Sequence, residues 1–372
     1  MAGPSAFVCT TCQQTYPLDT REWRCSCGGL FDLQPWPALD PSRIDASQSG
    51  LWRYRAFIPL AADWQAVTLG EQPTPLLPTE WEGMPVSFKL ESQCPTGSFK
   101  DRGASILVTA LQGLGVERIV DDSSGNAGSS LAAYTARAGI ACDICVPYSA
   151  AGPKLVQAAA YGAEIVQIKG KREYAALAAW AAAAHGAYYA SHVYNPFFLA
   201  GTETLAYELW EQLGRRAPAA VVMPVGSGSL FLGIYRGFRR LLRAGLVDRT
   251  PKLFGVQAEE CAPIYQAFLQ GQDTIEPQAC GPTIASAIAI SHPLRGQQIL
   301  AAVGESRGAM VTVSDQDISL SHQKLAHQGF YVEETAAAAV AALPALADRL
   351  APLDREPVVL VLTGHGLKTS TL

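Results

Sequence analysis

The apolar residues of this chain fall into short runs that alternate with alanine-rich stretches. Runs at 119–120, 143–146 and 165–166 have the character of buried strands, and alanine-rich segments separate them. From about residue 84 onward, this alternation is typical of right-handed βαβ units packed around parallel sheets. The alanine-rich segment 175–184 is shorter than the roughly 20 residues that cross a bilayer, so it predicts a helix that covers a sheet. We therefore expect an α/β protein.

The N-terminal part of the chain breaks this pattern. Residues 34–50 are proline-rich and irregular, and they mark the one clear boundary. Two cysteine pairs precede the boundary: Cys9-x-x-Cys12 and Cys25-x-Cys27. Four thiolates suit a tetrahedral, structural zinc site without an open position, and metal binding would stabilise a segment too small to fold alone. The second pair is one residue shorter than the usual spacing, so reduced free thiols are the alternative.

One lysine stands where a predicted turn meets a predicted helix. Residues 95–99 form the turn, Lys100 follows it, and an apolar helix is expected over 104–111. Desolvation and the positive end of a helix both favour a neutral lysine amine. A neutral amine of this kind can form a Schiff base with an aldehyde cofactor. Taken alone, the segment also fits a surface lysine on a capped helix.

Three further segments follow predicted strands. The first, which offers backbone amides to an anion such as a substrate carboxylate, comprises Ser123, Ser124, Gly125, Asn126 and Ala127. The second, here called the glycine loop, suits a phosphate and comprises Gly226, Ser227, Gly228, Ser229 and Leu230. The third ends on Thr363, whose hydroxyl is suited to a cofactor ring nitrogen. Each of them alone also fits an ordinary turn or helix start.

Length, net charge and cysteine content limit the classes of protein that the chain can represent. The 372 residues allow roughly two to three domains, and the net charge of −5 gives no reason to expect nucleic acid or a membrane as a partner. The N-terminus lacks the layout of a secretion signal. We expect a cytoplasmic, reducing compartment, in which the nine cysteines are thiols or metal ligands rather than disulfides. Cys142 and Cys145 are expected to be buried thiols on opposite faces of one strand.

Together and in this order, the four segments resemble the fold-type II pyridoxal-phosphate (PLP) enzymes, and the threonine synthase family in particular. The likeness runs through nearly the whole chain. Its most specific stretches are 95–103 and 363–368. Further matching stretches are 152–155, 161–164, 194–198, 254–259 and 283–285.

The resemblance implies a fold of two three-layer domains with parallel sheets and a zinc-ribbon-like extension. Its expected parts are a zinc-ribbon-like segment at 1–33, a linker at 34–50, a large PLP-binding domain at 51–103 and 201–372, and a small inserted domain at 104–200. The cofactor would lie in the cleft between the two larger domains, and the family suggests a homodimer. Lys100 would hold the cofactor and move protons, with Phe99 beside it. Asn126 would hold the phenolic oxygen, the glycine loop the phosphate, and Thr363 the ring nitrogen.

The implied activity is that of a lyase, which converts O-phosphohomoserine and water to L-threonine and phosphate. Four residues depart from the family pattern. Glu203 and Phe198 stand where a lysine or an arginine is common, Ala127 replaces a common threonine, and Cys94 replaces a typical asparagine. His365, Lys368 and Arg102 are the candidates that remain for contacting a substrate phosphate.

These departures leave room for other PLP reactions. The alternatives are β-replacement on phosphoserine, as in the related cysteate synthase, and dehydration of serine or threonine. A non-catalytic PLP-binding paralogue is the alternative from another class, although the retained Lys100 argues against it. The glycine loop also fits a dinucleotide oxidoreductase, because Gly226-x-Gly228 is followed by Gly233. The next acidic pair, at 259–260, lies beyond the spacing that ribose recognition needs.

Overall fold

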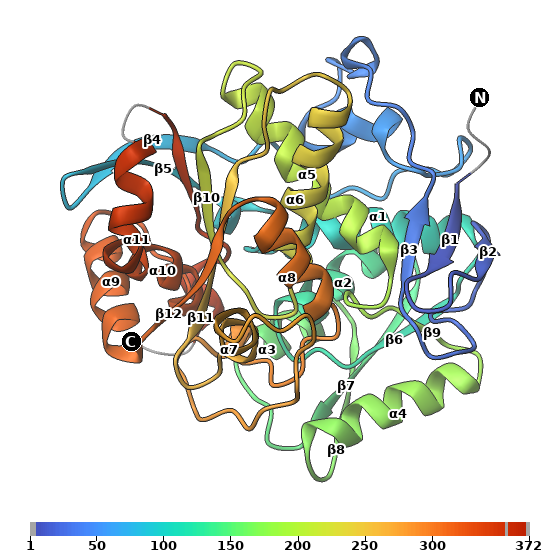
Figure 1. Cartoon of the computed structure of the whole chain (residues 1–372). Coiled ribbons are helices and arrows are strands. Elements are labelled where there is room, and N and C mark those ends of the chain that lie inside the picture. The colour runs from blue at the N-terminus through green and yellow to red at the C-terminus, as the bar shows by residue number, and fades with distance from the viewer. Residues whose placement is uncertain (1–4, 354–355, 370–372) are drawn as a thin grey trace. The chain divides into compact units, whose positions relative to one another are not determined.

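The computed structural model describes residues 5–353 and 356–369, which form two compact units (Figure 1). The first unit comprises Lys100–Thr202 together with the chain up to Gln72, and the second comprises Pro73–Phe99 and Glu203–Lys368. The first unit therefore includes residues 51–72, which the sequence analysis counted with the large domain. The division of the chain into functional domains stays a prediction.

A four-stranded parallel sheet in the order β8-β7-β6-β9 organises the first unit. Its strands are β6 (Arg118–Asp121), β7 (Ala141–Pro147), β8 (Glu164–Ile168) and β9 (Tyr188–Tyr189). One face packs against α1 (Lys100–Gly113), α2 (Asn126–Ala138) and α3 (Pro153–Ala160). The other face packs against α4 (Arg172–Ala184), whose buried residues Ala175 and Ala179 allow a close approach. The helix expected over 175–184 thus covers a sheet.

The strand alternation of β7 sends its two cysteines to different cores. Cys142 belongs to the buried cluster under α1 and α2, whereas Cys145 belongs to the cluster under α4. Burial raises the pKa of Cys142 to about 12 and that of Cys145 to about 11. Both residues are therefore buried thiols on opposite faces, as the sequence predicted.

The N-terminal segment folds as a small antiparallel sheet in the order β2-β1-β3. Its strands are β1 (Ala6–Cys9), β2 (Thr15–Pro17) and β3 (Phe31–Gln34). Phe7 packs against Phe31 with ring centroids 5.3 Å apart and against Phe197 at 5.4 Å. These aromatic contacts tie the segment into the core of the first unit, so its stability does not depend on metal alone.

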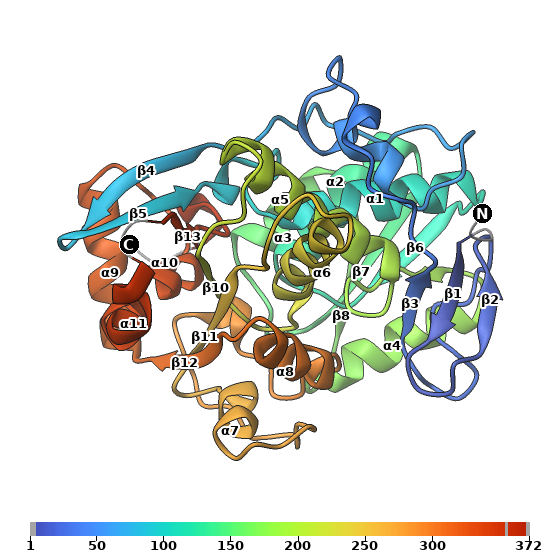
Figure 2. The ribbon, with the colours of Figure 1, turned by 45° about the horizontal axis from the view of Figure 1, so that its top comes forward.

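The second unit is built on a six-stranded sheet in the order β12-β11-β10-β13-β5-β4, with β4 as the antiparallel edge (Figure 2). Its strands are β4 (Leu76–Trp81), β5 (Met84–Lys89), β10 (Ala220–Pro224), β11 (Lys252–Ala258), β12 (Ala309–Val313) and β13 (Val358–Val361). The sequence analysis did not predict β4. A two-residue turn joins it to β5, and both turn residues, Glu82 and Gly83, have positive φ, as in tight hairpins.

Helices lie on both faces of this sheet (Figure 1). On one side are α9 (Asp315–His327), α10 (Glu334–Ala341) and α11 (Leu343–Leu350), and on the other are α6 (Ser229–Arg243) and α8 (Gly296–Glu305). The remaining helices are α5 (Pro196–Gln212), α7 (Pro263–Leu269) and the short 3₁₀ helices η1 (Pro41–Arg43), η2 (Gly50–Phe57), η3 (Glu91–Gln93), η4 (Ser286–Ile288), η5 (Ala351–Leu353) and η6 (Gly366–Lys368). The central strands are buried along their whole length, which is typical of a parallel sheet covered on both faces. The predicted fold class is confirmed.

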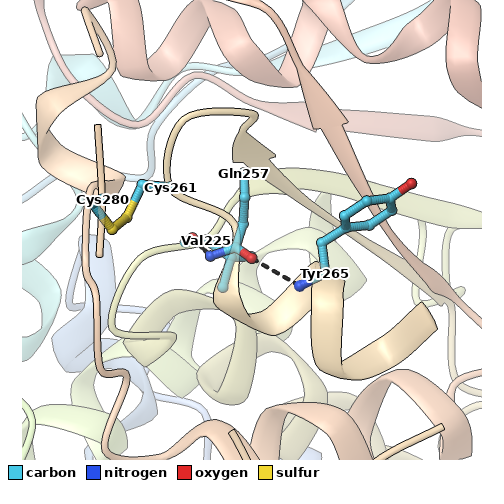
Figure 3. Close-up of a disulfide and its surroundings, with 5 residues drawn as sticks. All are labelled: Val225, Gln257, Cys261, Tyr265 and Cys280. Atoms are coloured by element: carbon cyan, nitrogen blue, oxygen red, sulfur yellow. Dashed lines mark hydrogen bonds between the residues drawn. A yellow bond between two sulfur atoms is a disulfide. The ribbon is translucent and has the colours of Figure 1, made fainter. Parts of the chain in front are cut away.

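One expectation about cysteine chemistry was wrong. The sequence analysis treated all nine cysteines as thiols or metal ligands, but Cys261 and Cys280 form a disulfide (Figure 3). The bond closes the segment 261–280, which contains α7, and the sequence alone did not indicate this pairing. Among the described residues, the helices are all too short or too polar to cross a membrane.

Candidate active site and cysteine cluster

The turn that precedes Lys100 is fastened to the segment after β13. Phe99 N donates to Thr363 O at 3.1 Å, and His365 N donates to Gly97 O at 2.9 Å. Gly97 has a φ of 85°, which favours glycine in this turn. The two most specific sequence motifs, more than 250 residues apart in the chain, are thus paired through their main chains.

Lys100 begins α1, beside the ring of Phe198. Its Nζ lies 5.8 Å from the ring centroid. Phe198 is fully buried, and a Cβ added to Gly103 would lie 2.4 Å from two of its ring atoms. Only glycine at position 103 therefore admits the ring at this distance. Where the resemblance led us to expect a cation, the structure thus places an apolar ring beside Lys100.

A histidine that no sequence motif indicated also lies in this neighbourhood. His192 stacks edge-on against Phe198, with ring centroids 5.6 Å apart. Burial lowers the pKa of His192 well below its usual range, and the positive charges of Lys100 and Arg172 lower it further. The imidazole is therefore neutral at physiological pH. No sequence motif marked it, because a lone histidine after an apolar stretch fits any core position.

The proposed substrate loop connects β6 to α2. Gly125 is the N-cap of α2, and no side chain caps the helix there. Gly125 N donates to Ser123 Oγ at 3.3 Å. A Cβ on Gly128 would lie 2.0 Å from Ser123 O, so this tight turn requires glycine. The buried Asn126 is the first residue of the helix, where backbone amides can receive an anion.

A buried acidic pair lies directly before this loop. Asp121 is fully buried at the end of β6, and Ser123 N donates to its Oδ2 at 3.2 Å. Burial, with the neighbouring charge of Asp122, raises the pKa of Asp121 to about 7. Asp122 accepts a hydrogen bond from the Tyr189 hydroxyl at 2.8 Å and pairs with Arg172. Asp121 is therefore about half protonated near neutral pH.

The glycine loop has the features of a phosphate cradle. It runs from β10 into α6, whose N-cap is Gly228, and no side chain caps the helix. Gly228 has a φ of 83°, and a Cβ there would lie 2.2 Å from Ile299 Cδ1. A Cβ on Gly226 would lie 3.0 Å from Ile288 Cα. Glycine at both positions keeps the backbone close-packed, and the N-cap makes no side-chain hydrogen bond at the start of α6, an arrangement that suits a phosphate group.

Topology brings the glycine loop and Thr363 to one edge of the larger sheet. β10 and β13 are adjacent and parallel, so their carboxyl ends meet, and the two segments follow those ends. Ligands of open α/β sheets bind at such edges. Lys100 and the loop with Asn126 belong to the first unit, at the N-terminal ends of two helices, α1 and α2, that pack together.

The departure at Glu203 has a structural explanation. Its carboxylate is buried, accepts a hydrogen bond from the Tyr207 hydroxyl at 3.0 Å and pairs with Arg240 at 2.9 Å. Burial raises the pKa of Glu203, which these partners oppose. Glu203 thus belongs to a polar cluster between α5 and α6.

Two of the residues named as candidates for a substrate phosphate, His365 and Lys368, make local hydrogen bonds. His365 Nδ1 accepts a hydrogen bond from Leu367 N at 3.1 Å, as in an ordinary turn. The buried Lys368 donates its ammonium to Thr96 O at 2.7 Å. Lys368 therefore also holds the turn before Lys100 in place.

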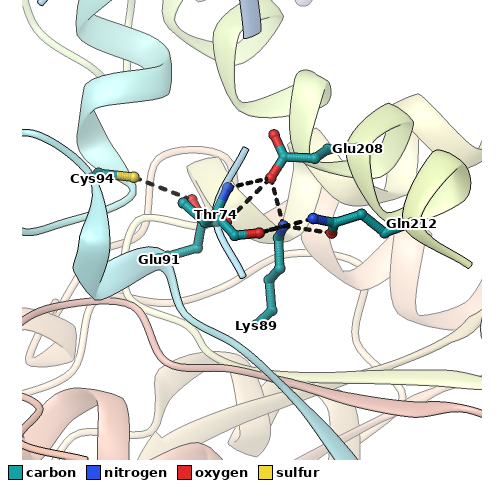
Figure 4. A network of polar contacts seen from close by, with 6 residues as sticks. All are labelled: Thr74, Lys89, Glu91, Cys94, Glu208 and Gln212. Carbon is teal, nitrogen blue, oxygen red and sulfur yellow. Dashed lines mark hydrogen bonds and ion pairs between the residues drawn. The ribbon is translucent and has the colours of Figure 1, made fainter. Parts of the chain in front are cut away.

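A buried ion pair that the sequence did not indicate stabilises the strand leading to this turn (Figure 4). Lys89 ends β5 and donates to Glu208 Oε1 at 2.5 Å, to Thr74 O at 2.7 Å and to Gln212 Oε1 at 2.7 Å. Three acceptors thus match the three protons of its ammonium. Lys89 has no exposed surface, and Glu208 is 2% exposed.

Further hydrogen bonds connect the ion pair to the turn that precedes Lys100. The Thr74 hydroxyl donates to Glu91 Oε1 at 2.6 Å, and Cys94 donates to Glu91 Oε2 at 3.7 Å. Cys94, for which the sequence gave no role, therefore contacts this network (Figure 4).

The four N-terminal cysteines form a cluster. Cys9, Cys12, Cys25 and Cys27 bring their sulfur atoms within 4.8 Å of one another. Two sulfur pairs are 3.5 Å apart, near the separation of about 3.8 Å that tetrahedral zinc with bonds of about 2.3 Å requires. The Tyr16 hydroxyl hydrogen-bonds Cys25 and lowers the pKa of that thiol to about 6. The donor set and its spacing fit zinc, including the shortened second pair.

Comparisons with known proteins extend over most of the chain. Residues 67–364 match the family model described as pyridoxal-phosphate dependent enzyme. The chain is 35% identical to threonine synthase of Methanocaldococcus jannaschii, over 97% of this chain and 92% of that protein. It is 33% identical to threonine synthase of Methanosarcina acetivorans, over 97% and 91%.

Solved structures agree on the fold. The crystal structure of a T.th. threonine deaminase is similar, with a TM-score of 0.67 and 26% identity over 79% of this chain and 92% of that chain. Maize serine racemase has a TM-score of 0.69 at 20% identity, over 79% and 88%, which supports the fold alone. The chain belongs to the family of pyridoxal-phosphate dependent enzymes, as a lyase related to the threonine synthases.

Proposed function

We propose that this enzyme is a threonine synthase, which converts O-phosphohomoserine and water to L-threonine and phosphate. The observation that carries the proposal is the likeness to threonine synthases along nearly the whole chain, with the Lys100 turn and the Thr363 segment intact. The Cγ–O bond of the substrate breaks, and the hydroxyl of threonine comes from water that adds at Cβ.

Four parts of the chain would hold the cofactor. Lys100 would bind its aldehyde carbon, Asn126 its phenolic oxygen, the glycine loop its phosphate, and Thr363 its ring nitrogen. When bound, PLP supplies an electron sink for negative charge that develops beside the substrate α-carbon. The glycine loop suits this role because its helix-end amides carry positive charge without a competing side chain.

Lys100 would move the protons of the reaction. Its amine would take the proton from Cα and return it later, and it would act from a fixed position at the start of α1. The turn before it is bonded to Thr363 and to Lys368, so the amine projects from a segment with little freedom. Phe198 forms an apolar side of its surroundings.

The substrate carboxylate would rest on Ser123, Ser124, Gly125, Asn126 and Ala127. The uncapped start of α2 supplies amides for it. Because Ala127 has no hydroxyl, the contact relies on the backbone and on the neighbouring serines. For the substrate phosphate we propose Arg102, a buried cation two residues after Lys100 in the first turn of α1.

We also propose a structural zinc ion on Cys9, Cys12, Cys25 and Cys27. Four thiolates would leave it no open coordination position, so it would have no part in the reaction. Elemental analysis of protein purified without chelator is expected to give about one zinc per chain. Absence of metal, with all four thiols freely reactive, would show that the cluster is not a metal site.

A serine or threonine dehydratase is the second candidate. The observation in its favour is that Phe198 is apolar and that Glu203 is paired with Arg240, so neither supplies a cation for a phosphorylated substrate. A dehydratase needs no such cation.

The test is turnover of four substrates by the same enzyme preparation. Phosphate and threonine formation from O-phosphohomoserine should exceed turnover of L-threonine, of L-serine, and of phosphoserine with sulfite. Faster turnover of a competitor would reject the threonine synthase assignment and leave the PLP assignment standing. Arg102→Gln should raise KM for O-phosphohomoserine far more than KM for L-serine.

A further inference from the structure

Two segments of the second unit, both distant in sequence from the glycine loop, pack against it. The first is the end of β11. Val225, the residue before the loop, donates its N–H to Val256 O at 2.8 Å, and Gln257 Nε2 donates to Val225 O at 3.4 Å. Gln257 is fully buried, and its Oε1 accepts a hydrogen bond from Tyr265 N at 2.9 Å (Figure 3). The carboxamide therefore holds the entrance of the loop in place.

The second supporting segment is the short helix η4. A Cβ on Gly226 would lie 3.0 Å from Ile288 Cα and 3.1 Å from Ala287 O. The main chain of η4 thus lies directly against the glycine loop. Any displacement of η4 opens space next to Gly226 and loosens the backbone that would hold the cofactor phosphate.

The disulfide joins these two segments. Cys261 follows the end of β11 and donates its N–H to Ala258 O at 3.0 Å, while Cys280 precedes η4. Next to the disulfide, Gly281 N donates to Glu260 O at 2.8 Å.

Between α7 and α8 the only regular structure in the described chain is η4. Its other tether is Asp315, which accepts hydrogen bonds from the Thr283 hydroxyl at 2.5 Å and from Ile284 N at 3.0 Å. The disulfide is therefore one of the anchors of the segment that carries η4.

We propose that Cys261 and Cys280 are a redox modification site that tunes the affinity of the glycine loop for PLP. The proposal rests on the assignment of this loop to the cofactor phosphate. A dithiol reductant donates two electrons and two protons, the S–S bond breaks, each cysteine becomes a thiol, and the reductant becomes a disulfide. Cys280 is partly exposed and Cys261 is 2% exposed, so the thiolate of the reductant attacks the sulfur of Cys280.

The experiment measures the Kd of PLP for the full chain by equilibrium dialysis, with the disulfide oxidised or reduced by dithiothreitol. Peptide mapping without reductant establishes the state of Cys261 and Cys280 in each sample. Reduction should raise the Kd by about fivefold or more, the range of ordinary coupling between sites. Cys280→Ser should bind PLP as weakly as the reduced wild type.

The Cys280→Ser variant is also the matched control for the reagent. Dithiothreitol should leave its Kd unchanged, so any direct reaction of the reagent with PLP would appear there. The same Kd for oxidised and reduced wild type would overturn the proposal, and so would free thiols at both positions in air-oxidised protein. Failure of PLP to bind in either state would instead reject the cofactor assignment on which the proposal rests.

Discussion

Removing the ammonium of Lys89 is expected to be among the most destabilising single changes in the second unit. Lys89→Met keeps most of the side-chain volume and removes the donor to Glu208, Thr74 and Gln212. The change leaves the Glu208 carboxylate, 2% exposed, without its ion-pair partner. Breaking a buried ion pair on one side costs about 3–5 kcal/mol. We expect a loss of unfolding free energy of that size.

The double variant separates the charge from the packing. Replacing both members of a buried pair by apolar residues of similar size is often neutral or even stabilising. Lys89→Met with Glu208→Leu should therefore be more stable than Lys89→Met alone, by about 2 kcal/mol or more. The matched control is Lys324→Met, which removes an exposed ion pair with Glu82 and should cost at most about 1 kcal/mol.

The assay is urea unfolding followed by circular dichroism, with comparison of the midpoints at equal slope. The losses of unfolding free energy in Lys89→Met and in Glu208→Leu, each made alone, should sum to more than the loss in the double variant. Two results would refute the interpretation of Lys89 as a buried, hydrogen-bonded ammonium. The first is additive losses of unfolding free energy, and the second is a loss in Lys89→Met as small as that in Lys324→Met.

Three other predictions concern the candidate site. Lys100→Ala should abolish turnover and the visible absorption of bound PLP, while borohydride reduction of wild type followed by peptide mapping should label Lys100; a label on Lys89 or Lys154 would refute the assignment. Gly228→Asp should weaken PLP binding at least about tenfold, because its Cβ would meet Ile299 and its charge would repel the phosphate; unchanged affinity in a PLP titration would remove the glycine loop from the site. Because the pKa of Asp121 is raised to about 7, the folded state keeps a proton that the unfolded chain has lost. The unfolding free energy of wild type should therefore fall relative to that of Asp121→Asn as pH rises from about 5 to 7, by about 1.4 kcal/mol per pH unit. Above pH 7 the difference between the two proteins should stay constant. A pH-independent difference between the two in urea melts would contradict that assignment.

The parts of the structure that the sequence predicted are those set by local patterns. The existence of strands β6, β7 and β8, the alternation along β7 and the helix that includes 104–111 follow from residues close together in the chain, although each strand is longer than its apolar run. The cysteine cluster was also predictable, because two pairs with short spacing carry their chemistry in the sequence.

Long-range pairings were not predictable in the same way. The Lys89–Glu208 ion pair joins residues that no motif connects, and a lysine at a strand end normally reaches solvent. The disulfide was not predicted because the composition favoured a reducing compartment. Composition also does not indicate which two sulfur atoms lie close together in the fold. Phe198 was recognised as a departure from the family pattern. Its packing against Gly103 was not predictable, because it depends on how α5 packs against α1.

The most direct test of the proposed function is to run the reaction on O-phosphohomoserine in water enriched in ¹⁸O. Because water adds at Cβ while the Cγ–O bond breaks, the label should appear in the hydroxyl of threonine and not in the released phosphate. Label in the phosphate with homoserine as the product would mean cleavage of the P–O bond. That result would contradict a threonine synthase acting through Lys100.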